Sequence, residues 1–197
     1  MSRKMIIGIF ILAVAFRIFT ALNYGDALKI LSDDRHYLYG SINFLKNGHI
    51  ASNPIYEPTM ISMPGSFLWF GALIKIFGYT QSGLTAVRIC LGIIDGITLI
   101  GIYKVVNKTI NDKVALLASF FYAVGIPFVC MANLFLSDSL TVFGIVWFFV
   151  YAIEYCETRD DKHFLLMFLF YFIALLQRAT IALIPVTLIP YFFKHRF

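Results

Sequence analysis

Long uninterrupted runs of apolar residues set the limits on what this chain can fold into. Several of them, such as 88–106 and 114–133, approach the roughly 20 residues that an α-helix needs to cross a bilayer. They do not alternate between apolar and polar residues, as the strands of a membrane barrel would. The composition agrees, because 60% of the residues are hydrophobic and only 14% are charged, and a soluble domain exposing that surface would aggregate. We therefore predict an all-α, polytopic membrane helix bundle.

The apolar runs predict a single transmembrane module over residues 1–197. The expected spans lie at about 5–22, 88–106, 114–133, 139–156, 164–177 and 180–193. The last two spans share a tight turn at Gln177–Arg178. A long outer loop, 23–87, separates the first two and contains predicted interfacial helices at 34–47 and 65–79.

The basic residues favour one orientation of this module. If 65–79 does not cross the membrane, the lysine- and arginine-bearing loops between spans fall on the same side as Arg3 and Lys4. The positive-inside rule then predicts that both termini are cytoplasmic. Most of the basic residues lie in such short clusters between apolar runs, so the net charge of +5 does not indicate nucleic acid, and we predict membrane lipids and no nucleic acid as partners. The composition favours a prokaryotic plasma membrane.

Two adjacent aspartates, Asp33 and Asp34, stand at the start of a stretch with the apolar spacing of a helix. In one interpretation, Ser32 or Asp33 caps that helix by accepting backbone N–H bonds. In the other, a carboxylate at the membrane surface acts as a general base or metal ligand. Both interpretations can hold for neighbouring residues, and the pattern leaves them open.

Asp138 marks the outer end of a later span. Ser137 or Asp138 could cap the next helix, or Asp138 could face Asp33 and Asp34 across one cavity. Carboxylates so close together repel one another unless a divalent cation or a cationic partner lies between them. A magnesium or manganese ion held by Asp138 with Asp33 or Asp34 is therefore one prediction.

Arg88 and Arg178 are predicted on the outer side, against the usual charge bias. Such residues can extend to headgroup phosphates, which is the better interpretation for Lys75. Alternatively, an arginine fork can bind the phosphate of a lipid-linked substrate, and Arg178, in its tight turn, is the strongest candidate.

Asp95 lies within a predicted span, where an acid is costly, so we expect it to pair with a neighbouring helix.

The order of these features resembles the N-terminal part of the GT-C superfamily of integral membrane glycosyltransferases. The protein O-mannosyltransferases and the bacterial lipid A aminoarabinose transferases are the most similar groups. The matching stretches, in chain order, are Asp33–Asp34 with Tyr37, Leu45-Lys46-Asn47-Gly48, Pro64–Gly65, IFGYTQSGLTAVR ending at Arg88, AVGIPF, SDSL with Asp138, and ALLQRAT with Arg178.

This resemblance implies an inverting transfer from a polyprenyl- or dolichyl-phosphate sugar to an acceptor hydroxyl of a lipid or protein, on the non-cytoplasmic face. It implies that the acidic pair is catalytic, with Asp33 as the base and Asp34 beside it. Tyr37, Arg88 and Arg178 would contact the substrate, and Asp138 would correspond to the acid that helps to hold a divalent cation in metal-dependent relatives. Family members are longer, so we expect a fragment, or a small relative that needs a partner subunit.

Two other functions fit the same sequence. A transporter of lipid-linked sugars would need acids and arginines near the bilayer midplane, where Asp95 is the residue that lies clearly that deep. A non-catalytic subunit that stabilises a partner glycosyltransferase would need no base. Replacing Asp33 by Asn distinguishes these possibilities, because it should abolish transfer only in an enzyme.

Overall fold

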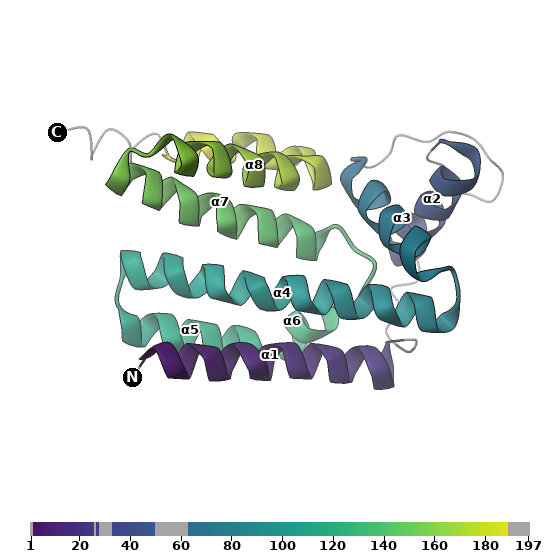
Figure 1. The fold of residues 1–197 in the computed structure, drawn as a ribbon, viewed down its shortest axis with the longest axis horizontal. Coiled ribbons are helices and arrows are strands. Elements are labelled where there is room, and N and C mark those ends of the chain that lie inside the picture. Colours follow the sequence, from purple (N-terminus) through teal and green to yellow (C-terminus); the bar gives the residue numbers. More distant parts are fainter. Residues whose placement is uncertain (1, 26, 28–32, 50–62, 189–197) are drawn as a thin grey trace.

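The computed structural model of the chain describes residues 2–25, 27, 33–49 and 63–188, which are mostly helical and contain no strand (Figure 1). The helices that lie side by side along the molecule are α1 (Ser2–Tyr24), α4 (Gln81–Thr109), α5 (Asp112–Val124), α7 (Asp138–Thr158) and α8 (Asp161–Gln177). The shorter elements are α2 (Asp33–Asn47), α3 (Gly65–Phe77), α6 (Ile126–Met131) and the 3-10 helix η1 (Ala179–Leu188).

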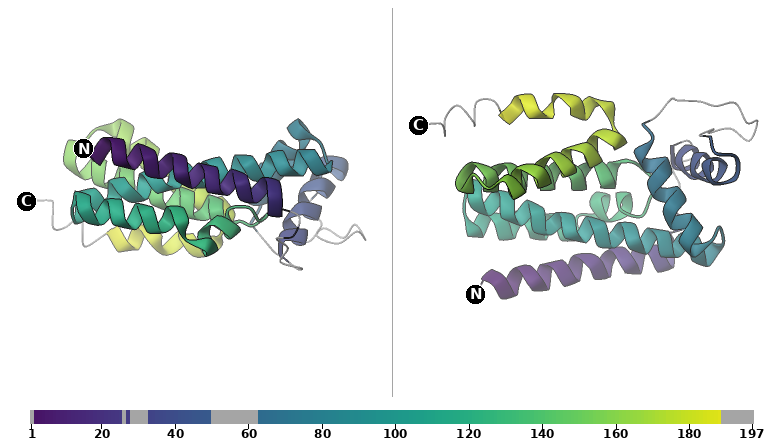
Figure 2. Two further views of the ribbon diagram at one scale, coloured as in Figure 1. Left: turned by 90° about the horizontal axis from the view of Figure 1, so that it is seen from below. Right: turned by 45° about the horizontal axis from the view of Figure 1, so that its top comes forward.

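The bundle has two distinct ends (Figure 1). At the amino-terminal end, α1 begins and the α4–α5 and α7–α8 connections turn. At the other, the α2–α3 end, α2 and α3 pack against each other, and α7 begins and α8 finishes nearby. Figure 2 shows the same arrangement from two further directions. The loops that the sequence analysis assigned to one face of the membrane therefore share one end of the bundle.

Three helices in the described part of the chain are long and apolar enough to cross a membrane. They are Arg3–Tyr24, Gln81–Thr109 and Asp138–Thr158, and they contain the first, second and fourth predicted spans. With helices throughout and no described strand, this confirms the prediction of an all-α membrane bundle. The helices α2 and α3 occupy the ranges expected for interfacial helices.

The predicted span 114–133 is not one helix, which corrects the sequence analysis. The chain forms α5, then leaves helical geometry at Gly125, with φ −63° and ψ 112°, and resumes as α6. Proline at position 127 explains the break. In a continuous helix the Ala123 carbonyl would accept the N–H of residue 127, and proline has none.

The last two predicted spans also differ from the structure in form. The helix α8 begins earlier than expected, at Asp161, where the Asp160 carboxylate accepts the Lys162 N–H at 2.9 Å. After α8 the chain continues as a 3-10 helix with Pro185 inside it. The end of the predicted span 180–193 lies outside the described residues.

Glycines allow α1 to approach α4 closely. A Cβ atom on Gly96 would lie 2.5 Å from Cγ2 of Val14, and one on Gly92 would lie 2.9 Å from Cβ of Arg17. Small residues at such positions are the usual way for membrane helices to pack tightly. The close approach brings Arg17 of α1 against Asp95 of α4.

Arg17 and Asp95 form a buried ion pair, so the prediction that Asp95 pairs with a neighbouring helix is confirmed. The Arg17 Nε donates to Asp95 Oδ2 at 2.5 Å, and the Tyr122 hydroxyl donates to Asp95 Oδ1 at 2.6 Å. The Arg17 Nη atoms also donate to the carbonyls of Tyr122 and Ala123, each at 3.2 Å. Arg17 thus supplies the donor that Pro127 cannot offer to Ala123.

Candidate functional site

The α2–α3 end of the bundle gathers several of the predicted site residues. It contains the start of α2 with its acidic pair, the start of α7 with Asp138, and the end of α8 with Arg178 (Figure 1). A cluster of buried residues, including Phe70, Leu91 and Phe135, packs beneath α2 and joins α3, α4 and the α6–α7 connection. This core sets the position of α2 relative to the bundle.

Ser137 connects three of the elements at this end. Its hydroxyl oxygen accepts from the Tyr37 O–H at 3.2 Å and from the Arg178 Nε at 3.3 Å. The side chain is fully buried, and it does not cap α7. Tyr37 of α2 and Arg178 after α8 are therefore linked through one serine at the start of α7.

Arg178 also pairs with Asp138. Its Nη2 donates to Oδ1 and Oδ2 of the carboxylate at 2.8 and 2.9 Å. The Arg178 side chain remains 48% exposed, so part of the guanidinium group faces outward while Asp138 and Ser137 hold it in place. The sequence predicted that a divalent cation or a cationic partner would neutralise Asp138. In the structure, the cationic side chain of Arg178 pairs with it.

Asp33 and Asp34 both lie in the first turn of α2, where the helix dipole favours negative charge. Asp34 is buried, and its Oδ1 accepts the Arg35 N–H at 2.8 Å. Asp33 is exposed. Tyr37 follows Asp33 by four residues and Asp34 by three, so the three residues lie on neighbouring positions of one helical face. Ser32, the other predicted cap, lies outside the described residues.

His36 adds a titratable group beside the acidic pair. Its ring packs edge-on against Tyr37 and Phe67, each at a centroid distance of 5.3 Å. Burial lowers the pKa of His36 below its ordinary value, and the negative charge of Asp33 partly opposes that shift. The lowered pKa favours a neutral His36, which the sequence analysis did not include in the site.

The described carboxylates are not arranged as a metal site. No group of three or more His, Cys, Asp or Glu side chains that could hold a metal ion occurs among the described residues. Asp138, the predicted ligand, directs both oxygens to Arg178 instead. A cation bound by Asp138 with Asp33 or Asp34 stays a prediction.

Arg88, which the sequence predicted on the outer side at the start of a span, lies inside α4. Thr80 caps α4 by accepting the Gly83 N–H at 3.1 Å, so the helix begins at Gln81 and Arg88 lies two turns inside. The side chain is buried, with its guanidinium carbon 5.1 Å from the centre of the Phe135 ring. Its predicted contact with the substrate stays a prediction.

An apolar groove of about 460 Å³ lies beside Arg178, between α3, α4, α7 and α8. Its lining includes Leu68, Trp69, Phe143, Ile173 and Gln177. The sequence analysis did not identify this groove, because it depends on how α3 meets α8.

The first turn of α3 closes one side of this groove against the end of α8. The Ser66 hydroxyl donates to Oε1 of Gln177 at 2.5 Å. A Cβ on Gly65 would lie 2.6 Å from the Leu176 carbonyl oxygen. Trp69, in the groove wall, has a buried indole N–H with no hydrogen-bond acceptor among the described residues, which is uncommon and costly for a buried donor.

Comparison with known proteins places the chain with a family of membrane enzymes. The family model of dolichyl-phosphate-mannose-protein mannosyltransferases matches residues 63–196, which include α3, Asp138 and Arg178. No curated protein and no solved structure matches the chain. The family match covers more than half of the 197 residues and agrees with the resemblance of the motifs and with the helical membrane fold. The chain therefore belongs to the dolichyl-phosphate-mannose-protein mannosyltransferase family, whose members are membrane glycosyltransferases of the GT-C type.

Proposed function

We propose that this chain transfers a sugar from a polyprenyl- or dolichyl-phosphate donor to a hydroxyl group of a lipid or protein acceptor, with inversion, on the non-cytoplasmic face of the membrane. The observation that carries the proposal is Arg178, held by Asp138 and Ser137 at the end of an apolar groove with part of its guanidinium group exposed. An apolar channel next to a fixed cation suits a substrate with a long hydrocarbon tail and a phosphate.

The donor would lie with its tail in the groove between α3 and α8. The groove volume of about 460 Å³ is within the range of about 300–1,000 Å³ that is usual for ligand pockets. The phosphate would contact Arg178, which directly follows Gln177 in the groove wall, because a guanidinium fork matches phosphate oxygens well.

Asp33 would act as the base, because its carboxylate is exposed whereas that of Asp34 is buried. As the acceptor oxygen attacks the anomeric carbon, its proton passes to Asp33. The bond between that carbon and the phosphate oxygen breaks, and the electron pair leaves with the lipid phosphate. Attack opposite the leaving group inverts the configuration. Arg178 would offset the negative charge that develops on the phosphate.

The base and the arginine would be kept in register by the contact between α2 and α7. The Tyr37 hydroxyl binds the same serine as Arg178, and Tyr37 lies one helical turn from Asp33. Tyr37 and Ser137 are positioning residues in this proposal.

The first prediction concerns Asp33 and Arg178. In reconstituted membranes with a polyprenyl-phosphate sugar, Asp33→Asn should lower the transfer rate about 10²–10⁴-fold, which is the usual contribution of a general base, and leave donor binding unchanged. Arg178→Lys should weaken donor binding, because lysine cannot form the bidentate contact. The assay is transfer of a radiolabelled sugar, combined with a separate measurement of donor binding.

Arg159→Lys is the matched control, since Arg159 ends α7 at the amino-terminal end of the bundle. Unchanged transfer by Asp33→Asn would contradict the assignment of the base. Donor binding without transfer by the wild type would favour the non-catalytic subunit instead.

The predicted divalent cation is tested in the same assay. Such an ion would require Arg178 to release Asp138, because the carboxylate now directs both oxygens to the guanidinium group. Loss of transfer in EDTA, with recovery on adding Mg²⁺ or Mn²⁺, would support the ion. Full transfer in EDTA would contradict it.

The transporter hypothesis finds less support in the membrane-spanning region. Asp95, the acid predicted near the midplane, is already paired with Arg17 and Tyr122. An acid held by two partners is poorly suited to bind a transported substrate or ion.

A further inference from the structure

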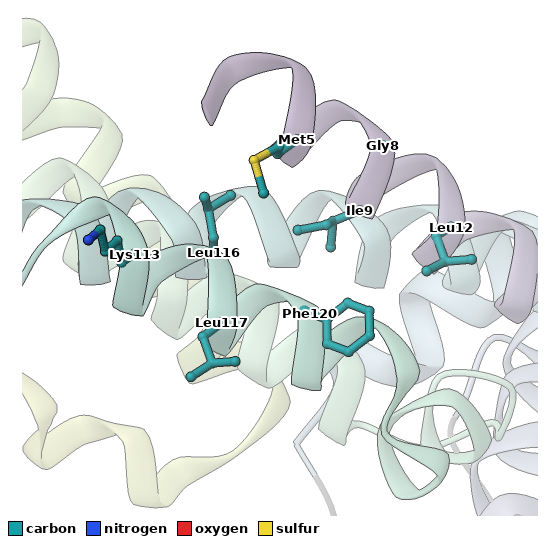
Figure 3. Close-up of a pocket in the computed structure, with 8 residues that line it drawn as sticks. All are labelled: Met5, Gly8, Ile9, Leu12, Lys113, Leu116, Leu117 and Phe120. Carbon is teal, nitrogen blue, oxygen red and sulfur yellow. The ribbon is translucent and has the colours of Figure 1, made fainter. Parts of the chain in front are cut away.

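A second groove, of about 590 Å³, lies between α1 and α5 and is separate from the proposed donor groove. Figure 3 shows that its walls come from the first half of α1 and from α5 between Lys113 and Phe120. Both of these segments lie toward the amino-terminal end of the bundle (Figure 1). The groove is therefore remote from the α2–α3 end and from Arg178.

A fixed contact between α1 and α5 lies beyond one end of the groove. Further along both helices, Arg17 donates hydrogen bonds to the Tyr122 and Ala123 carbonyls and holds α1 against α5. Nearer their beginnings, α1 has Gly8, and a Cβ atom built there would meet nothing within 4 Å. Gly8 therefore leaves space open, in contrast to Gly96, which allows a close helix contact.

The walls of the groove are apolar and open to the surroundings. Leu12, Leu117 and Phe120 line it and are 36%, 55% and 44% exposed. In a bilayer such a surface is covered by hydrocarbon. The volume is in the usual range for a ligand site, about 300–1,000 Å³.

Among the described residues that line the groove, Lys113 carries the charge, and it lies in the first turn of α5 at the edge of the groove (Figure 3). Within the described ranges no hydrogen bond or ion pair involves its side chain. By contrast, Lys104 pairs with Glu154 at 3.3 Å and Lys108 with Glu157 at 2.6 Å. The neighbouring carboxylate, Asp112, accepts the Tyr103 hydroxyl at 2.6 Å.

Further positive charge lies at the same end of the bundle. Arg3 and Lys4 are exposed in the first turn of α1, and the first turn of α5 adds the positive end of a helix dipole. A ligand with a hydrocarbon chain and an anionic head matches both the apolar walls and this charge. A second copy of the chain would fill the groove with an apolar helix and leave Lys113 unmatched.

We propose that the groove between α1 and α5 binds an anionic phospholipid, with an acyl chain between the two helices and its headgroup phosphate on Lys113. This site is distinct from the donor groove and does not depend on the proposed transfer reaction. Its occupant would fill the space beside Gly8 and stabilise the contact of α1 with α5.

The test is native mass spectrometry of the purified protein in detergent with added phosphatidylglycerol or phosphatidylcholine. Wild type should retain phosphatidylglycerol about fivefold better, as expected for one basic side chain near a phosphate. Lys113→Gln should remove this preference. Gly8→Leu, which fills the groove, should reduce the binding of both lipids.

Two control variants are available. Lys162→Gln removes an exposed lysine from α8, and Ala15→Leu places the same leucine side chain at an exposed position of α1 that does not line the groove. Both should bind phosphatidylglycerol as wild type does. If Gly8→Leu does not fold, the comparison of Lys113→Gln with Lys162→Gln decides the question.

Equal preference for phosphatidylglycerol in wild type and Lys113→Gln would overturn the proposal. A dimer in the mass spectrum that Gly8→Leu abolishes would also overturn it, because the groove would then be an interface between copies of the chain.

Discussion

At the scale of single residues, Arg17 has the densest set of interactions described for this protein. It is fully buried, and its guanidinium group donates to Asp95 and to the carbonyls of Ala13, Tyr122 and Ala123. The guanidinium carbon of Arg17 also lies 5.3 Å from the centre of the Tyr122 ring. One side chain therefore holds three helices together.

The second prediction follows from this network. Arg17→Met leaves the Asp95 carboxylate buried without its counter-ion, which should lower the free energy of unfolding by about 3–5 kcal/mol. Adding Asp95→Leu should recover much of that loss, because an apolar pair of similar size often replaces a buried ion pair without large cost. The remaining deficit should be about 1–3 kcal/mol, because the Tyr122 and Ala123 carbonyls lose the Arg17 donor and the Tyr122 hydroxyl loses its Asp95 acceptor.

Denaturant unfolding in detergent micelles measures both variants. A double variant as unstable as Arg17→Met alone would mean that the helices depend on the carbonyl contacts of Arg17 and not on its charge.

The sequence predicted some of these residues and missed others for a physical reason. The cost of a charge in a membrane helix identified Asp95, and the local charge pattern identified Asp138 and Arg178. Neither consideration reveals which helices are neighbours. Arg17 lies within the predicted span 5–22, so the cost of its charge could have singled it out as it did Asp95, but its partners come from helices distant in the sequence. Ser137 has no such local signal and acquires its role only from those tertiary contacts.

At the scale of helices, two features of local chemistry changed the predicted boundaries. Apolar composition placed the start of a span at residue 88, whereas the Thr80 cap starts α4 at Gln81. The apolar composition also predicted one continuous helix through Gly125 and Pro127, where the structure has an interruption between α5 and α6. Helix lengths followed from hydropathy, but the exact ends depended on caps and on a missing N–H group.

The third prediction compares two glycines of α1 and α4. Gly96→Ala should destabilise the protein by about 1–3 kcal/mol, the usual cost of overpacking, because the new methyl group would meet Val14 Cγ2 at 2.5 Å. Gly8→Ala meets nothing within 4 Å and should be neutral or stabilising by up to about 1 kcal/mol, from the higher helix propensity of alanine. Thermal unfolding of both variants in lipid-free detergent is the measurement.

The reverse order of stabilities would show that α1 presents a different face to α4. An equal effect of both substitutions would mean that helix propensity, rather than packing, dominates at these positions.

At the scale of the whole molecule, the arrangement of the two ends determines which residues can share a site. The helix α3 lies at one end with α2 (Figure 1), so α2 before it and the start of α4 after it are found at the same end. The positive-inside rule led to the same grouping from the sequence, because the basic loops could then lie together. The charge bias thus predicted which loops lie at the same end of the bundle, but not the contacts between their residues.

The fourth prediction tests this grouping by labelling in intact cells. In a variant without Cys90, Cys130 and Cys156, single cysteines at Asn47 and Ser82 flank α3 and are both exposed positions. Both should react with an impermeant thiol reagent, whereas a cysteine at Thr158, at the other end of the bundle, should not. Reaction at only one of the two flanking positions would show that α3 crosses the membrane.

The ion pair between α1 and α4 also matters for the order in which the helices are synthesised. Arg17 and Asp95 are separated by 78 residues, and ribosomes add about 5–20 residues per second. For roughly 4–16 s, the newly made first helix therefore carries a cation whose partner has not yet been synthesised. An arginine at the centre of a membrane helix costs about 2.5–3.5 kcal/mol on insertion scales. Until α4 is synthesised, α1 therefore bears the cost of an unpaired charge in the membrane, and the pairing of Arg17 with Asp95 removes that cost.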